Sequence, residues 1–224
     1  MRRMTTFVAI VVGMAVCISL IPSKAISEGP PKVLLIIREG YSTDIEYMLW
    51  KEVWPMRLML MGAGFKVEVA TASGHRITSP GPDLVPDLRL DEVKVADYVG
   101  FIMPCMAVGG IPGPPIAPEA VAIVKQALAD GKPVAAQFGS VVILAHAGIL
   151  KGKKYAFFDD PLKPTPFRKF TDPRFADAIY SGRGVVQDGN IITSGTCPML
   201  ARLFGAPDGT SELTQTFINE LKKK

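Results

Sequence analysis

The sequence is poor in the residues that build most metal centres and disulfide frameworks. Its 224 residues include only 3 cysteines and 2 histidines. Cys105 and Cys197 are the two cysteines beyond residue 25, and neither has metal-ligand spacing to the other or to His75 or His146. We therefore expect no metal site, no cofactor and no disulfide framework, although an exported compartment would permit one bond between these cysteines.

A strong excess of charge is also lacking. The formal net charge is +4, and three of the basic residues (Arg2, Arg3 and Lys24) fall in the first 25 positions, which contain no acid. Without that segment the net charge is +1. The run Lys222–Lys224 is typical of a solvated tail, so the sequence predicts no nucleic-acid partner.

The first residues have the pattern of a targeting segment. Arg2–Arg3 precede the apolar run Phe7–Ile21, and small residues stand at both ends of Ser23–Ala25. This pattern predicts a signal peptide over residues 1–25 and export to the periplasm or the exterior. An uncleaved N-terminal membrane anchor is the alternative, which the short apolar run disfavours. After cleavage we expect one domain, 26–224, with no membrane span.

The middle of the chain alternates between apolar runs and helical patterns. Lys32–Arg38 is a continuous apolar run, typical of a strand covered on both faces. Phe65–Thr71 is expected to be a second strand and Tyr98–Met103 a third, buried strand. A helix is expected from about Thr43 to Gly64, with a kink or break at Pro55. This β-α-β order predicts a parallel sheet with right-handed crossovers.

The rest of the chain continues the same alternation. A helix opens at Pro118 and ends at Gly131, followed by the stretch that organises the fold, Lys132–Lys154. We expect there a buried strand, a sharp turn at Phe138–Ser140 and a helix. The remaining predictions are a short strand at Leu88–Val93, an edge strand at Lys153–Phe158, a hairpin at Val185–Ser194 and helices at Met199–Phe204 and Ser211–Lys223.

These segments, in this order, resemble the ThiJ/PfpI superfamily, the group that includes the parkinsonism-associated deglycase and the PfpI-type intracellular proteases. The resemblance is carried by V-L-L-I-I, D-I-E, A-D-Y-V-G-F-I-M-P, G-K-P-V-A-A, L-A-H-A-G-I-L-K-G-K-K and V-V-Q-D-G-N-I-I-T-S. It implies a flavodoxin-like three-layer α/β sandwich of the class I glutamine amidotransferase type, often dimeric. It also implies a site at the carboxyl ends of the strands, where an open parallel sheet forms its crevice.

The residues that carry the family's chemistry are changed. An alignment from Ala135–Ala136 onward puts Phe138 where the family has its nucleophilic cysteine, and Gly139 where a histidine often follows. Phenylalanine has no lone pair for nucleophilic attack. The family's L-P-G-G is replaced by Met103–Met106, and the nearest glycine pair is displaced. With Gly139 beside Phe138, we expect the strained turn to relax onto the glycine.

One acidic position matches the family. Glu46, in D-I-E, falls where the resemblance implies a carboxylate that contacts the nucleophile and shares its proton. The alternative is that Glu46 only closes a capping box on Thr43. Ser140 is expected to cap the following helix, and is otherwise a weak candidate nucleophile.

Three functions follow from this pattern. The first is a non-catalytic exported protein that binds a small molecule or a protein partner and forms a homodimer. The second is a hydrolase, amidase or glyoxalase-like enzyme that uses Glu46 with Cys105 or Ser140. The third is a redox-responsive protein in which Cys105 and Cys197 pair. The expected pocket residues are Gln137, Phe138, Gly139, Met106 and Cys197.

Overall fold

The computed structural model describes residues 29–40, 42, 44–107, 114–166 and 168–223. The predicted signal peptide therefore lies outside the described residues, as do Thr43 and the displaced glycine pair. None of the helices in the described part is long and apolar enough to cross a membrane.

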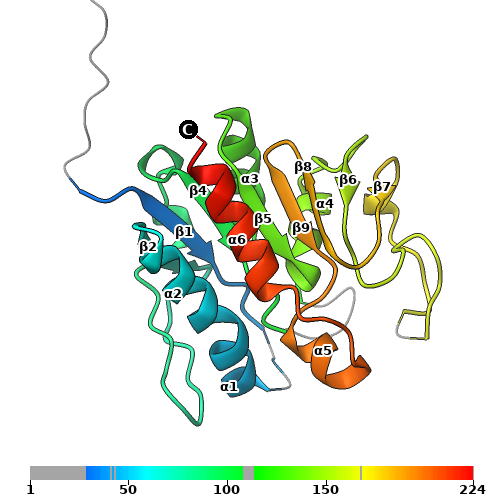
Figure 1. Cartoon of the computed structure of the whole chain (residues 1–224), viewed down its shortest axis with the longest axis horizontal. Helices are drawn as coiled ribbons and strands as arrows, with labels where there is room; N and C mark the ends of the chain where they lie inside the picture. Colours follow the sequence, from blue (N-terminus) through cyan, green and yellow to red (C-terminus); the bar gives the residue numbers. More distant parts are fainter. Residues whose placement is uncertain (1–28, 41, 43, 108–113, 167, 224) are drawn as a thin grey trace, which may run out of the picture.

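A seven-stranded sheet forms the middle layer, in the order β3-β2-β1-β4-β5-β9-β8 (Figure 1). Its strands are β1 (Lys32–Ile36), β2 (Lys66–Thr71), β3 (Leu88–Arg89), β4 (Gly100–Met103), β5 (Val134–Gln137), β8 (Val185–Asp188) and β9 (Ile191–Ser194). All neighbours pair in parallel except β8 and β9, which form the predicted antiparallel hairpin. The flavodoxin-like α/β fold expected from the sequence is confirmed.

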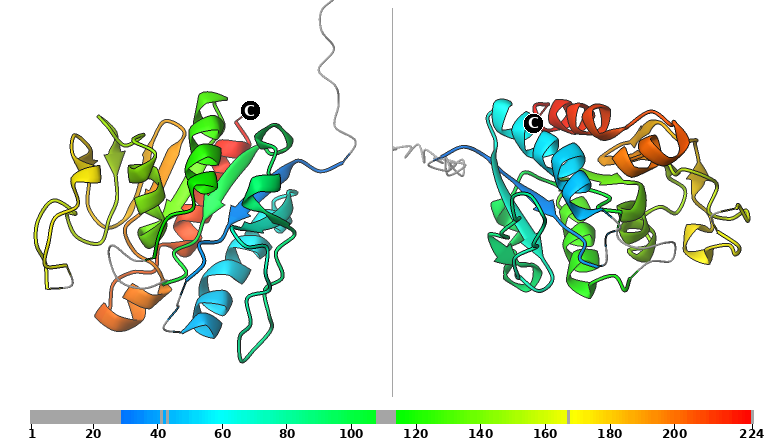
Figure 2. Two further views of the ribbon diagram at one scale, coloured as in Figure 1. Left: turned by 180° about the vertical axis from the view of Figure 1, so that it is seen from behind. Right: turned by 90° about the horizontal axis from the view of Figure 1, so that it is seen from below.

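Helices cover both faces of the sheet, which gives three layers (Figure 2). One face is covered by α1 (Ile45–Met48), α2 (Trp54–Gly62), α5 (Pro198–Phe204) and α6 (Thr210–Leu221), and the other by α3 (Pro118–Ala129) and α4 (Val141–His146). Each side has its own buried apolar cluster, and the central strands β1, β4 and β5 contribute to both. Burial on both faces explains why these strands are continuous apolar runs.

The expected break in the first helix occurs just before Pro55. The five-residue π-helical turn η1 (Leu49–Val53) separates α1 from α2, and Pro55 lies in the first turn of α2. Proline cannot donate a backbone hydrogen bond, so the wider turn accommodates it without ending the helix. π-helical turns inside α-helices often occur at functional sites.

The strand expected at Lys153–Phe158 does not join the main sheet. Its first residues form β6 (Lys154–Tyr155), which pairs in parallel with β7 (Ile179–Tyr180) in a separate two-stranded sheet. The backbone N–H of Ala156 donates to the hydroxyl of Thr193 on β9. This side-chain hydrogen bond replaces the backbone hydrogen bond that Ala156 would make with β9 if it joined the main sheet. Phe157 and Phe158 then turn inward and are buried.

Candidate functional site: a buried thiol centre at the carboxyl edge of the sheet

Four adjacent strands end next to one another, and a chemically distinctive residue follows the end of each. Arg38 follows β1, Cys105 follows β4, Phe138 follows β5 and Cys197 follows β9. The strand order β1-β4-β5-β9 makes these ends neighbours. The connections reverse direction between β1 and β4, which is where open α/β sheets form their binding crevice.

The sulfur of Cys105 is the centre of this group. Cys105 is buried, and its sulfur receives hydrogen bonds from the thiol of Cys197 and from the backbone N–H groups of Gly139 and Ala107. The Cys197 hydrogen bond is the main cause that lowers the pKa of Cys105, and the two N–H groups add to it. The same bond, with burial, raises the pKa of Cys197 well above its ordinary value. The pair therefore favours a thiolate on Cys105 and a proton on Cys197.

Glu52 brings a buried carboxyl group to the same place. It projects from the π-helical turn η1 and is fully buried. Its Oε1 accepts the backbone N–H of Cys105 and its Oε2 accepts that of Met106, both at 2.8 Å. Burial first, and then the neighbouring Cys105, raises the pKa of Glu52 well above the ordinary range. The raised pKa favours the protonated form of Glu52 next to the sulfur, and its two hydrogen bonds fix the backbone after β4.

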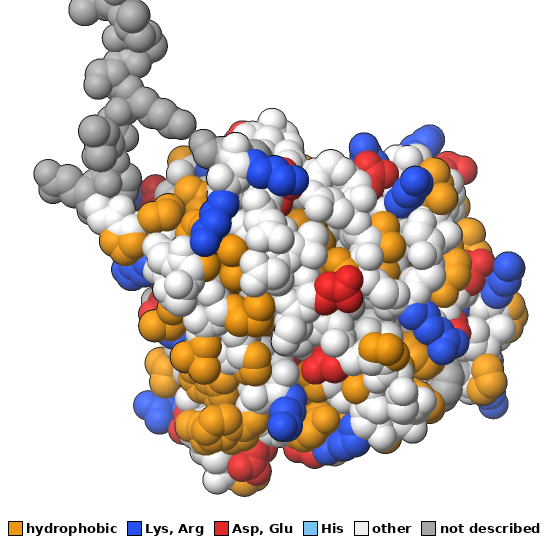
Figure 3. All heavy atoms as spheres, viewed as in Figure 1, with side chains coloured by type: hydrophobic (Ala, Val, Ile, Leu, Met, Phe, Trp, Pro, Cys, Tyr) orange, Lys and Arg blue, Asp and Glu red, His pale blue; other side chains and the backbone are white. Residues whose placement is uncertain are grey.

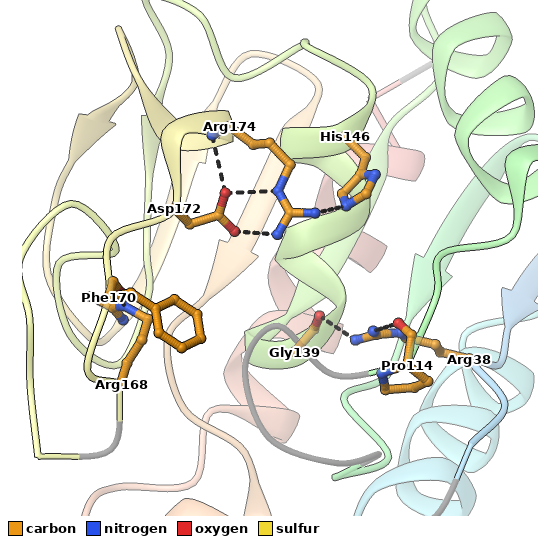
Figure 4. A network of polar contacts seen from close by, with 8 residues as sticks. All are labelled: Arg38, Pro114, Gly139, His146, Arg168, Phe170, Asp172 and Arg174. Atoms are coloured by element: carbon orange, nitrogen blue, oxygen red, sulfur yellow. Dashed lines mark hydrogen bonds and ion pairs between the residues drawn. The ribbon is translucent and has the colours of Figure 1, made fainter.

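Arg38 supplies the positive charge that this group needs. Its guanidinium donates to the carbonyl oxygens of Gly139 (3.3 Å) and Pro114 (2.5 Å), as Figure 4 shows. Its buried Nε has no hydrogen-bond partner among the described residues. Burial lowers the pKa of Arg38, and its attraction to Cys105 opposes this. The buried cation of Arg38 can balance the negative charge of one ionised group among Glu52, Cys105 and Cys197.

The turn after β5 is strained at Phe138. Phe138 has φ +32°, whereas Gly139 has no positive φ, so the expected relaxation onto the glycine is wrong. The reason is packing: Gly139 lies against Cys105, and its N–H is used by the sulfur. Met106 (φ +57°) and Ala107 (φ +48°) are also strained, and they flank the same sulfur. Strained backbone of this kind tends to occur at functional sites.

The ring of Phe138 lies at the edge of the sheet in a cluster of aromatic side chains, called here the aromatic group, which also contains Phe157, Phe158 and Phe204. It contacts Phe157 and Phe158, with ring centroids 4.9 Å and 6.3 Å away. The ring centroid of Phe204 lies 5.4 Å from that of Phe158, and the guanidinium of Arg183 stacks over the Phe158 ring at 4.2 Å. The turn after β5 thus places an apolar side chain at the edge of the sheet.

The structure does not place Glu46 with the cysteines. Glu46 lines a hollow of about 510 Å³ with its helix neighbours Asp44, Tyr47, Trp50 and Lys51. The N-terminus of α1 is capped by Asp44, which accepts the N–H of Tyr47, and the expected partner Thr43 lies outside the described residues. The carboxylate at the sulfur is Glu52, which lies beyond Glu46 on the same helical segment.

The other polar candidates are engaged in structural hydrogen bonds. Ser140 is fully buried and donates to the carbonyl oxygen of Pro104 at 2.5 Å, rather than capping α4 as expected. Gln137 is fully buried and donates to the Thr196 carbonyl and the Thr210 hydroxyl, both at 2.9 Å. These bonds tie β5 to its neighbours and leave Ser140 without a base.

Neither Glu52 nor Arg38 was predicted as a site residue from the sequence, although the sequence pattern around Glu52 is unusual. It interrupts the apolar series Met48, Met56 and Leu60, which repeats every four residues along one buried helix face. An acid in such a stripe must be paired or protonated. Arg38 is less distinctive, because charged residues often follow buried strands.

Both histidines lie apart from the thiol centre. His75 is exposed in the loop after β2. His146 is exposed at the end of α4 and contacts Arg174, which pairs with Asp172 through two hydrogen bonds (Figure 4). Burial and the cation of Arg174 lower the pKa of His146. Within the described ranges, no three His, Cys, Asp or Glu residues are grouped as a metal ion would require.

Comparison with known proteins identifies a family and several relatives. The family model described as DJ-1/PfpI family matches residues 31–205. An uncharacterized protein of Methanocaldococcus jannaschii is 33% identical over 178 residues, which are 78% of each chain. A protein of Thermococcus kodakarensis named a deglycase is 31% identical over 167 residues, which are 73% of this chain and 89% of the relative.

Solved structures show the same fold. Drosophila melanogaster DJ-1β superposes with a TM-score of 0.61 at 24% identity, covering 87% of this chain and 92% of that one. A ThiJ/PfpI domain protein of Brachyspira murdochii gives a TM-score of 0.62 at 16% identity, covering 88% and 99%.

Proposed function

Because this chain belongs to the DJ-1/PfpI family, we propose that it is a diverged member that no longer catalyses at the turn after β5 and instead binds a small molecule or a protein partner. The observation that carries this proposal is the ring of Phe138, which stands at the position expected for the nucleophile and packs on Phe157. A side chain with no lone pair and no transferable proton supports binding and not bond cleavage.

The aromatic group around Phe138 favours a ligand with an apolar or aromatic part. Leu203 and Phe204 at the end of α5 are 60% and 43% exposed, beside the buried Phe158. Apolar and aromatic side chains with a few polar groups are typical of small-molecule sites. Arg183, which pairs with Asp159, adds a cation that stacks over the Phe158 ring. An aromatic carboxylate fits this combination.

The second candidate function is thiol catalysis at Cys105. It is favoured by the hydrogen bonds that stabilise a thiolate there and by the protonated Glu52 beside it. The similar protein from Thermococcus kodakarensis is named a deglycase. In this alternative Cys105 would attack a carbonyl carbon and Glu52 would supply the proton to the developing oxyanion.

Two assays separate the two candidates. The purified protein would be incubated with methylglyoxal and with a methylglyoxal-glycated thiol, and its melting temperature would be measured against a panel of aromatic carboxylates. We expect no turnover above the buffer rate and a rise in melting temperature with at least one ligand, which Phe204→Ala should reduce. Turnover abolished by Cys105→Ser would overturn the binding function in favour of the enzyme.

Phe138→Cys tests whether the turn can still support a reactive thiol. The position is half-buried, whereas Cys105 is buried, so the new thiol should be alkylated by iodoacetamide at least about tenfold faster than Cys105 at pH 8. Peptide mapping by mass spectrometry measures this ratio. We expect no gain of methylglyoxal turnover, since Glu52 is committed to the backbone after β4. A gain would mean that the ancestral chemistry needs only the missing sulfur.

Export and dimerisation form part of the same proposal. N-terminal sequencing of the protein recovered from the periplasm should start at Ile26, and an intact N-terminus in the membrane fraction would instead identify an anchor.

For a homodimer, hydrophobic side chains gather over the segment from α1 to α2 (Figure 3), where Trp50 of η1 and Leu58 and Met61 of α2 are each more than half exposed. Leu58→Asp should then shift light-scattering mass from dimer to monomer.

A further inference from the structure

We propose that Cys105 and Cys197 form an oxidisable dithiol that a small hydroperoxide converts to a disulfide. This inference is independent of the binding function, because it concerns the buried side of the sheet edge and not the aromatic group. It assigns Cys105 as the sulfur that is oxidised first and Cys197 as the thiol that resolves it. Both are free and buried in the structure.

The two sulfurs meet although their positions are 92 residues apart in the sequence. Cys105 follows β4 and Cys197 begins α5 after β9, with β5 between the two strands. The thiol of Cys197 donates a hydrogen bond to the sulfur of Cys105, so no other group separates them. A disulfide requires two cysteines in contact, and both lie buried in the same apolar cluster with their side chains in contact.

Gly139 gives the Cys105 sulfur its place. A Cβ at this residue would lie 3.3 Å from that sulfur and 3.6 Å from the Cys105 carbonyl oxygen. The 3.3 Å distance to the sulfur is shorter than an ordinary contact, so a larger residue at position 139 would push the sulfur away from the turn. The absent side chain at Gly139 thus lets its own N–H reach the sulfur.

The surroundings favour the charge that the first step needs. Two backbone N–H groups and the Cys197 thiol point at the Cys105 sulfur, and Arg38 lies close enough to be attracted to it. We place the proton that Cys105 gives up on Glu52, which accepts the N–H groups of Cys105 and Met106 at 2.8 Å and whose ionised form is disfavoured by burial and by the neighbouring thiolate. The thiolate is the form of cysteine that attacks peroxides.

The chemistry balances with a hydroperoxide as the only oxidant. The Cys105 thiolate attacks the terminal oxygen, an S–O bond forms, the O–O bond breaks, and the departing alkoxide takes the proton held by Glu52. Cys105 is then a sulfenic acid, oxidised by two electrons. The Cys197 sulfur attacks it, an S–S bond forms, the S–O bond breaks, and the Cys197 proton leaves with the hydroxide as water. A hydroperoxide and two thiols have become an alcohol, water and a disulfide.

Burial selects the oxidant. Cys105 is 3% and Cys197 is 1% exposed, so only a small molecule such as hydrogen peroxide can reach the sulfurs without local opening. Bulky alkylating reagents should react slowly with the reduced protein. The same burial should protect the disulfide from large protein reductants, so we expect a low-molecular-weight dithiol to reverse it faster than a thioredoxin-type protein does.

The test uses the full chain with Cys17→Ser, so that the two buried cysteines remain alone. After treatment with hydrogen peroxide, intact mass should fall by two hydrogens and peptide mapping should join Cys105 to Cys197. Closing so long a loop should raise the melting temperature by roughly 5–15 °C, and dithiothreitol should reverse the rise. The variant Cys197→Ser should instead leave Cys105 as a sulfenic acid that dimedone traps.

Circular dichroism of each variant shows whether it is folded before oxidation, so that loss of structure is not mistaken for loss of chemistry. Glu52→Gln should slow oxidation at least fivefold while the disulfide still forms. Two free thiols in folded protein after peroxide treatment would overturn the proposal. Equally, Cys105 oxidised to sulfinic acid while Cys197 stays free would show that Cys197 does not resolve it.

Discussion

Glu52→Ala is expected to reduce the free energy of unfolding by about 3 kcal/mol, because two buried donors lose their acceptor. The N–H groups of Cys105 and Met106 both donate to this carboxyl group at 2.8 Å, and the side chain is fully buried. Each buried unsatisfied donor costs on the order of 1–3 kcal/mol. Urea unfolding followed by circular dichroism at pH 7 measures the difference.

Glu46→Ala is the matched control on the same helical segment. Glu46 is partly exposed at the surface hollow beside α1, so we expect a change within about 0.5 kcal/mol. Equal effects of the two substitutions would contradict the assignment of Glu52 as the acid of the thiol centre. The comparison also decides between the acid that the sequence indicated and the acid that the structure places there.

Glu52 also predicts the pH dependence of stability. Its pKa in the folded protein is raised well above the ordinary 4.5. At a pH between 4.5 and the raised pKa, Glu52 is ionised in the unfolded chain but still protonated in the folded protein. The free energy of unfolding therefore falls as pH rises from about 4.5. The contribution approaches about 1.4 kcal/mol for each pH unit in that window.

The difference between wild type and Glu52→Gln isolates this contribution, because every other titrating group is common to both. His146, whose lowered pKa acts in the opposite direction near pH 6, cancels in the difference. We expect the wild type to lose stability relative to Glu52→Gln from pH 5 to pH 7 in urea titrations. A difference that does not change with pH would mean that Glu52 is ionised in the folded protein.

Gly195→Ala is expected to destabilise the protein by about 3 kcal/mol or more, the upper range for overpacking. A Cβ at Gly195 would lie 2.5 Å from the Phe157 carbonyl oxygen and 2.7 Å from that of Arg183. Both are backbone atoms, so neither can move away as a side chain would. The melting temperature and urea midpoint measure the loss.

Gly184→Ala is the control for this substitution. A Cβ at Gly184 would meet no atom within 4 Å, and its φ is not positive. We expect a change within about 0.5 kcal/mol there. Because Gly195 lies two residues before Cys197, Gly195→Ala should also slow formation of the disulfide. A neutral Gly195→Ala would show that the end of β9 is free to shift.

Much of the scaffold could be predicted from local sequence because the sheet is buried on both faces. Apolar runs located β1 and β4, and Asp188-Gly189 located the β8–β9 hairpin. Pro55 located the break in the first helix. The strand at Lys154 was placed in the wrong sheet, since strand pairing depends on Thr193 and Tyr180, which are distant in sequence.

The candidate site was predicted less completely. The sequence by itself predicted that Cys105 follows a buried strand and that the turn after the next strand has Phe138 at its apex, because both depend only on residue type and local pattern. Only the tertiary structure decided that Cys197 contacts Cys105, that Glu52 and not Glu46 is their acid, and that Phe138 keeps the strained conformation. Hydrogen bonds and steric contacts between residues far apart in the chain decide these features, and no local pattern encodes them.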